Sequence, residues 1–105
     1  MALTRSFKDT VKARADRDPA FRIGLFQEAM NAFMDGDVET GKIVLRDYVN
    51  ATVGFEKLGK ELHKNPKNLM RMLSAKGNPR TDNLFAVLAH LKAQENVSLT
   101  FEAAT

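Results

Sequence analysis

Apolar residues recur through most of this chain at the three- and four-residue spacings of helices that bury one face. One stripe predicts a helix over residues 19–34 and comprises Leu25, Phe26, Ala29, Met30, Phe33 and Met34. A second stripe follows Asp37 and comprises Gly41, Val44, Leu45, Tyr48 and Val49. A third stripe comprises Leu84, Phe85, Val87, Leu88 and Leu91. Together the stripes predict an all-α protein whose helices each contribute one face to a shared core.

Capping residues mark where these helices are expected to begin. Asp18 and Asn65 each precede a proline, so the capping side chain can accept a backbone N–H while the proline occupies the first helical position. Asp37 predicts the start of the third helix, and either Thr81 or Asp82 predicts the start of the last. The expected helices cover residues 7–15, 19–34, 38–53, 55–62, 66–74 and 82–95.

The two ends of the chain carry different patterns. Ser6, with Asp9 three residues later, predicts the cap of the first helix. Residues 97–101 alternate apolar and polar side chains, which predicts a short C-terminal strand paired with another chain, because a lone strand leaves its backbone unpaired. The alternative is a frayed tail that packs Leu99 and Phe101 onto the core. We expect one domain, with N-terminal helices in 1–53, a helix pair and the next helix in 54–95, and the strand or tail in 96–105.

Residues 55–74 have the layout of a helix-turn-helix, two short helices joined by a tight turn. Gly59 is a small residue that lets two helices approach closely, at a cost of about 1 kcal/mol of helix propensity relative to alanine. His63 stands in the turn, where a residue with left-handed backbone is expected. In a DNA-binding helix-turn-helix the second helix enters the major groove. Here Lys67, Asn68 and Arg71 are predicted to lie on the polar face of that helix.

Positive charge is concentrated on the same segment. The chain of 105 residues has a net charge of +3, and residues 1–53 contribute none of it. Residues 54–80 contain seven basic and two acidic side chains, a net charge of +5, whereas residues 81–105 have a net charge of −2. A local positive surface attracts a polyanion and releases its counterions on binding. A solvated charged face is the alternative that charge alone leaves open.

The segment therefore predicts an interface for double-stranded DNA. Its candidate side chains are cations and amides that suit phosphates or base edges, namely Lys64, Asn65, Lys67, Asn68, Arg71, Lys76 and Arg80. Backbone N–H groups near Asn65 and after Asn78 are further candidates for holding a phosphate. Met70 is expected to pack on a neighbouring loop, and contact with a thymine methyl group is the alternative.

Other kinds of site are not expected. The chain has no cysteine, and His63 and His90 lie on different elements, so the sequence predicts no metal site, no cofactor and no catalytic group. Acidic residues in 35–39 resemble the start of a calcium loop but lack its glycine and final glutamate, so a turn and a cap are expected there. No apolar run approaches the ~18 residues of a membrane span and no signal peptide is apparent, which predicts a cytoplasmic protein without a membrane or small-molecule partner.

Residues 54–92 resemble the addiction-module antidote proteins, HigA-type antitoxins among the lambda-repressor-like transcriptional regulators, through the string GFEKLGKELHKNPKNLMRMLSAKGNPRTDNLFAVLAHLK. The most telling segments are LMRML (69–73), KGNP (76–79) and NLFAVLAHL (83–91). Residues 7–21 and 36–52 are also similar to the family's N-terminal half, so the resemblance spans nearly the whole chain. The sequence departs from the family at Gly59, where alanine is frequent, and at His63, where many helix-turn-helices have glycine.

This resemblance implies a compact all-α fold of five or six helices and an operator-binding protein, usually a homodimer, that represses its own operon. It also implies a toxin partner of the RelE/ParE superfamily, an mRNA-cleaving enzyme that the antitoxin neutralises by binding; the N-terminal helices and residues 97–101 are the candidate toxin-binding elements. The resemblance places recognition at Asn65, Lys67, Asn68 and Arg71. We therefore expect a DNA-binding regulator of the antitoxin type that is not an enzyme. The alternatives are a stand-alone phage- or prophage-type repressor and a protein-interaction module that has lost DNA binding.

Overall fold

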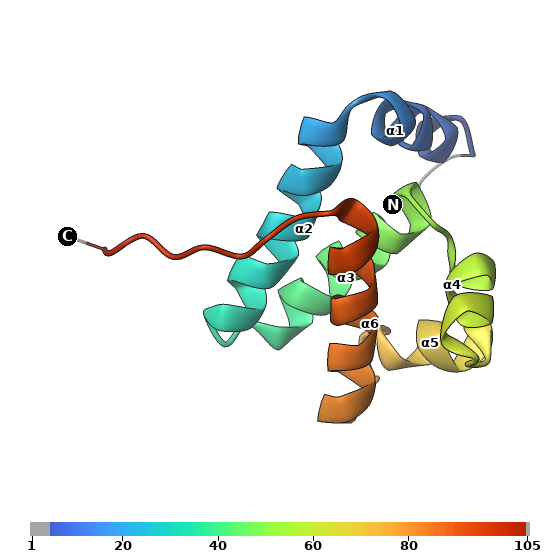
Figure 1. Cartoon of the computed structure of the whole chain (residues 1–105). Helices are drawn as coiled ribbons and strands as arrows, with labels where there is room; N and C mark the ends of the chain where they lie inside the picture. Colours follow the sequence, from blue (N-terminus) through green and yellow to red (C-terminus); the bar gives the residue numbers. More distant parts are fainter. Residues whose placement is uncertain (1–4, 105) are drawn as a thin grey trace.

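The computed structural model describes residues 5–104, and the side chains of residues 9–104. This part of the chain forms six α-helices and contains no strand, which confirms the predicted all-α class (Figure 1). The helices are α1 (Arg5–Arg17), α2 (Pro19–Met34), α3 (Val38–Ala51), α4 (Phe55–Leu62), α5 (Pro66–Met72) and α6 (Thr81–Glu95). None of the helices in the described residues is long and apolar enough to cross a membrane.

Three of the predicted helix starts are confirmed by capping hydrogen bonds. The Asp18 carboxylate accepts the Phe21 N–H at 3.2 Å, with Pro19 as the first helical residue. The Asp37 carboxylate accepts the Thr40 N–H at 3.2 Å. Hydrogen bonding to Thr40, through its side chain first and its backbone second, lowers the pKa of Asp37. The Asn65 side chain caps α5 in the same way, so these local sequence signals fix where α2, α3 and α5 begin.

A single core joins the two halves of the chain. Helix α2 packs most extensively against α3, and α6 runs between this pair and the α4–α5 pair (Figure 1). The core side chains are Phe26, Ala29, Val44, Leu45, Tyr48, Val49, Phe55, Leu58, Leu69, Leu73, Val87, Leu88 and Leu91. Because these residues come from α2 to α6, the short helices α4 and α5 are held by tertiary packing rather than by their own helix propensity.

A buried carboxylate ties α6 to the N-terminal half. Arg22 Nε lies 3.1 Å from Glu95 Oε2, and the Tyr48 hydroxyl donates to Glu95 Oε1. Burial, together with this hydrogen bond, raises the pKa of Tyr48. Arg22 Nη1 also donates to the Ala15 carbonyl at 2.6 Å, so one guanidinium joins α1, α2 and α6.

A second polar cluster joins α6 to α4. The Glu61 carboxylate lies 2.8 Å from His90 Nε2 and accepts from Gln94 Nε2 at 2.6 Å. These hydrogen bonds, the one to His90 first, lower the pKa of Glu61. The cluster therefore links the last turn of α4 to α6.

Several predicted boundaries and faces are wrong. Helix α1 begins at Arg5, which places Ser6 inside its first turn, and α5 ends at Met72 rather than at residue 74. Helix α6 begins after Arg80 without a side-chain cap, so neither Thr81 nor Asp82 is the capping residue. Phe85, expected in the core, is 59% exposed because it lies on the side of α6 away from Val87 and Leu91; Met34, at the last turn of α2, is also exposed.

The C-terminal strand predicted at residues 97–101 is not present. Residues 97–104 are extended and lack secondary structure, and they run away from the helices (Figure 1). Val97 packs against the core, whereas Leu99 and Phe101 are exposed, so the frayed-tail alternative is wrong in its packing as well. The physical reason is that a strand needs a neighbouring strand for its backbone, and the rest of the described chain is helical.

Candidate nucleic-acid interface

The turn between α4 and α5 is as tight as the sequence indicates. His63 has φ 55°, ψ 44°, the left-handed conformation expected for the turn. A Cβ atom added to Gly59 would lie 2.7 Å from the Lys64 carbonyl oxygen and 2.9 Å from Pro66 Cγ. The absence of a side chain at Gly59 therefore lets the chain fold back directly onto α4 and start α5.

Helix α5 buries one face and leaves the other open to solvent. Leu69 is buried and Met72 half-buried, whereas Lys67, Asn68 and Arg71 are exposed. Met70 is also exposed, at 42%, so the expected packing of this side chain on a neighbouring loop is incomplete. The polar face predicted for α5 is thus free of the core, which is the arrangement that entry into a DNA groove requires.

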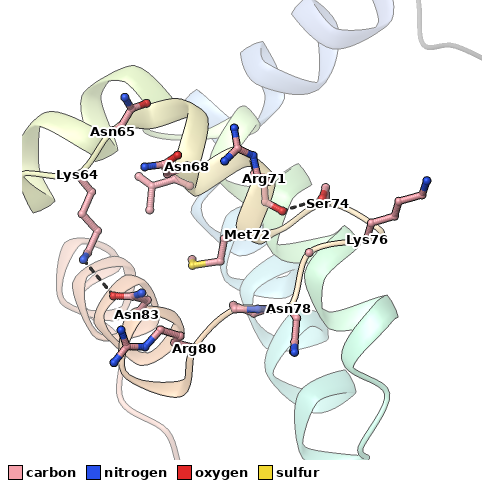
Figure 2. A pocket seen from close by; sticks show the side chains of 13 residues that line it. Lys64, Asn65, Asn68, Arg71, Met72, Ser74, Lys76, Asn78, Arg80 and Asn83 are labelled. Atoms are coloured by element: carbon pink, nitrogen blue, oxygen red, sulfur yellow. Dashed lines mark hydrogen bonds between the residues drawn. The ribbon is translucent and has the colours of Figure 1, made fainter.

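A hollow of about 630 Å³ lies beside this helix, between α5, the segment after it and the start of α6 (Figure 2). Six of the seven predicted DNA-contacting residues line it, and the seventh, Lys67, is on the exposed surface of α5. The polar residues around it are Lys64, Asn65, Asn68, Arg71, Ser74, Lys76, Asn78, Arg80 and Asn83. In Figure 2 these side chains surround Met72, so the rim is polar and cationic and the floor is apolar.

The predicted cations differ in how far they are engaged within the protein. Lys64 Nζ donates to Asn83 Oδ1 at 3.1 Å, and Arg80 lies 3.5 Å from the Asp82 carboxylate on the surface. No acidic side chain in the described residues forms an ion pair with Lys67, Arg71 or Lys76. These last three cations are therefore the ones most available to an external anion.

Asn65 has a structural role that limits what it offers a ligand. Its Oδ1 accepts the Lys67 N–H at 2.8 Å as the cap of α5. The amide nitrogen of Asn65 is left as a donor, and Asn68 on the next turn keeps both its donor and its acceptor. Of these two asparagines, Asn68 is therefore the one whose donor and acceptor are both uncommitted, as the paired contact with adenine requires.

Three side chains of the rim were not predicted. Ser74 Oγ donates to the Arg71 carbonyl at 2.6 Å and closes the end of α5, and Asn83 holds Lys64 across the hollow. Asn78 was expected to contribute only nearby backbone. Their positions depend on how the segment 73–80 folds between two helices, a feature that neither spacing nor composition reports.

The described residues contain no group of three His, Asp or Glu side chains that could hold a metal ion. No family model, curated protein or solved structure matches this chain. The resemblance of residues 54–92 to the addiction-module antidote proteins therefore stays a prediction. The geometry of α5 and of the hollow beside it is the basis on which a function can be proposed.

Proposed function

We propose that this protein is a sequence-specific DNA-binding transcriptional regulator of the lambda-repressor-like kind. The observation that carries the proposal is that α5 exposes Lys67, Asn68 and Arg71 without an acidic partner among the described residues, beside a hollow with a cationic rim. A short exposed helix with these side chains has the size and chemistry to enter the major groove of DNA. The charge of the segment, +5 over residues 54–80, supports the same conclusion.

The mechanism is equilibrium binding without a chemical step. Arg71 suits the two acceptors that guanine presents in the major groove, and Asn68 suits adenine. Lys67, on the exposed face of α5, and Lys76, at the far end of the hollow, suit phosphates on either side of the bases that α5 would read. Helix α4 supports α5 through the close approach at Gly59 and would lie across the DNA backbone.

The proposal is tested by titrating a duplex of mixed sequence, and then duplexes selected from a random pool, with the protein at several salt concentrations. Several phosphate contacts are expected, so affinity should fall by about a hundredfold or more between 50 and 200 mM salt. A selected duplex should bind more tightly than the mixed one at each salt concentration. Affinity that is flat across this salt range, or equal for both duplexes, would contradict the proposal.

The regulator acts as a homodimer. Phe85, Leu99 and Phe101 are exposed apolar side chains in the C-terminal part of the chain, and a second copy would remove them from water. A two-fold dimer reads two half-sites about 34 Å apart, one turn of DNA. Light scattering is expected to give twice the 11.7 kDa mass of one chain, and selected duplexes should contain two inverted half-sites. A monomer in solution bound to a single half-site would contradict this prediction.

Toxin neutralisation is supported only by the resemblance of residues 54–92, which implies an antitoxin that represses its own operon together with a RelE/ParE-superfamily toxin. A stand-alone repressor would bind its operator without such a partner. Co-purification with the product of the adjacent gene separates the two. A protein-interaction module that has lost DNA binding would fail the duplex titration altogether.

A further inference from the structure

A lysine is buried directly behind the hollow. Lys42, on α3, is only 5% exposed and forms no ion pair in the described part of the chain. An ammonium group this far from water requires hydrogen-bond acceptors around it, because removing a charge from water is costly. The acceptors that Lys42 finds are all backbone carbonyls of the segment that follows α5.

The ammonium of Lys42 gathers three carbonyls of one loop, residues 74–78. Nζ donates to the Ser74 carbonyl at 3.0 Å, to the Gly77 carbonyl at 2.6 Å and, at 3.5 Å, to the Ala75 carbonyl. These bonds use all three donors of the side chain. The loop is therefore attached to α3 through a single charged group more than 30 residues away in sequence.

The same loop forms part of the hollow. Ser74, Lys76, Gly77 and Asn78 line it, and Figure 2 shows Lys76 and Asn78 at the end of the hollow away from Lys64. The backbone N–H groups of Lys76 and Asn78 have no acceptor in the described residues. The loop thus has its carbonyls engaged by Lys42 while two of its amides remain available as donors, the combination that suits a phosphate.

We propose that Lys42 is a positioning residue of the DNA interface: it holds the 74–78 loop so that the amides of Lys76 and Asn78 contact a DNA phosphate. The inference rests on the proposed function and adds to it a residue that does not touch DNA itself. Because Lys42 is buried, its replacement removes no direct contact with DNA, and any loss of phosphate binding beyond the loss of one charge acts through the loop.

The experiment compares wild type, Lys42→Met and Lys42→Arg on the mixed-sequence duplex across a salt series, well below the unfolding temperature of each variant. Lys42→Met removes the three bonds while keeping the aliphatic stem. The slope of log K against log salt is expected to become shallower by about 1, because the displaced loop no longer holds its amides and the Lys76 cation at that one phosphate. Lys42→Arg keeps a cationic donor and should recover part of the slope. Lys92→Met, a charge loss on α6 outside the hollow, should leave the slope unchanged.

A second measurement makes the result independent of stability. Hydrogen exchange and amide chemical shifts of residues 74–78 are expected to change in Lys42→Met, and less in Lys42→Arg, in step with the salt slope. If the Lys42→Met protein does not fold, the test is made between wild type and Lys42→Arg. In that comparison, a loop that changes while the salt slope does not would overturn the role of Lys42. An unaltered loop in Lys42→Met, or an altered loop with wild-type DNA affinity, also overturns it. A wild-type protein that binds no duplex overturns instead the proposed function on which the role depends.

Discussion

Replacing Arg71 with alanine is expected to weaken binding of a selected duplex by about 1–3 kcal/mol, roughly 5- to 150-fold, and to relax the base preference at one position. The guanidinium is exposed on α5 and has no acidic partner among the described residues, so its removal leaves the fold intact. The variant would no longer form the guanine interaction that we assign to Arg71. Selection from a random pool with wild type and variant measures both the affinity and the preference.

Arg17→Ala is the matched control for this variant. Arg17 is an exposed arginine in the last turn of α1, at the opposite end of the molecule from α5 (Figure 1). Its removal changes the net charge by the same amount, so it measures the long-range electrostatic contribution alone. If the two variants bind the selected duplex equally well, Arg71 does not contact a base.

Gly77→Ala is expected to lower the free energy of unfolding by about 1–3 kcal/mol, the usual result of forcing atoms into a packed site. A Cβ atom at Gly77 would overlap the Arg71 carbonyl oxygen and lie 2.7 Å from that of Met72. Both neighbours are backbone atoms at the end of α5, so the loop must move away from the helix. For a chain of this size, thermal unfolding should shift down by about 4–8 °C for each kcal/mol.

The opposite result is expected for Gly24→Ala, the same substitution where space is available. Gly24 lies in the interior of α2 with nothing within 4 Å of an added Cβ atom. Alanine should stabilise the helix by about 0.8–1.0 kcal/mol through its better propensity. Thermal melts of the two variants side by side therefore test the packing at Gly77, and a Gly77→Ala protein as stable as wild type would contradict it.

The sequence predicts those features of the fold that depend on contacts between residues close together in the chain, such as helix caps and tight turns. Asp18 and Asp37 cap the helices that they were expected to cap, because each cap involves residues only three positions apart. His63 adopts the left-handed backbone conformation expected of it, because that conformation also depends on the few residues of the turn. Phe85 shows the limit, since the helical period places it beside the core stripe but the arrangement of the other helices leaves it 59% exposed.

Of the candidate site, the sequence predicts the exposed side chains but not the buried residue behind them. The polar face of α5 follows from the spacing of Lys67 and Arg71, and the structure leaves both exposed. Lys42 gives no such signal, because a lysine in an amphipathic helix is expected at the solvent face, and its burial depends on carbonyls more than 30 positions away. The extended tail has the alternation of a strand, but alternation cannot supply the neighbour that a strand requires.

The contacts of Arg22 bear on any attempt to shorten this molecule to the segment that we propose binds DNA. Its guanidinium joins the Ala15 carbonyl and the Glu95 carboxylate, and Glu95 in turn holds Tyr48. Cutting the chain before Gly54 would leave an anion without its counter-charge and strip the apolar side of α6 of its cover. The first half thus supports the second, and a transplanted α4–α5 pair would have to include it.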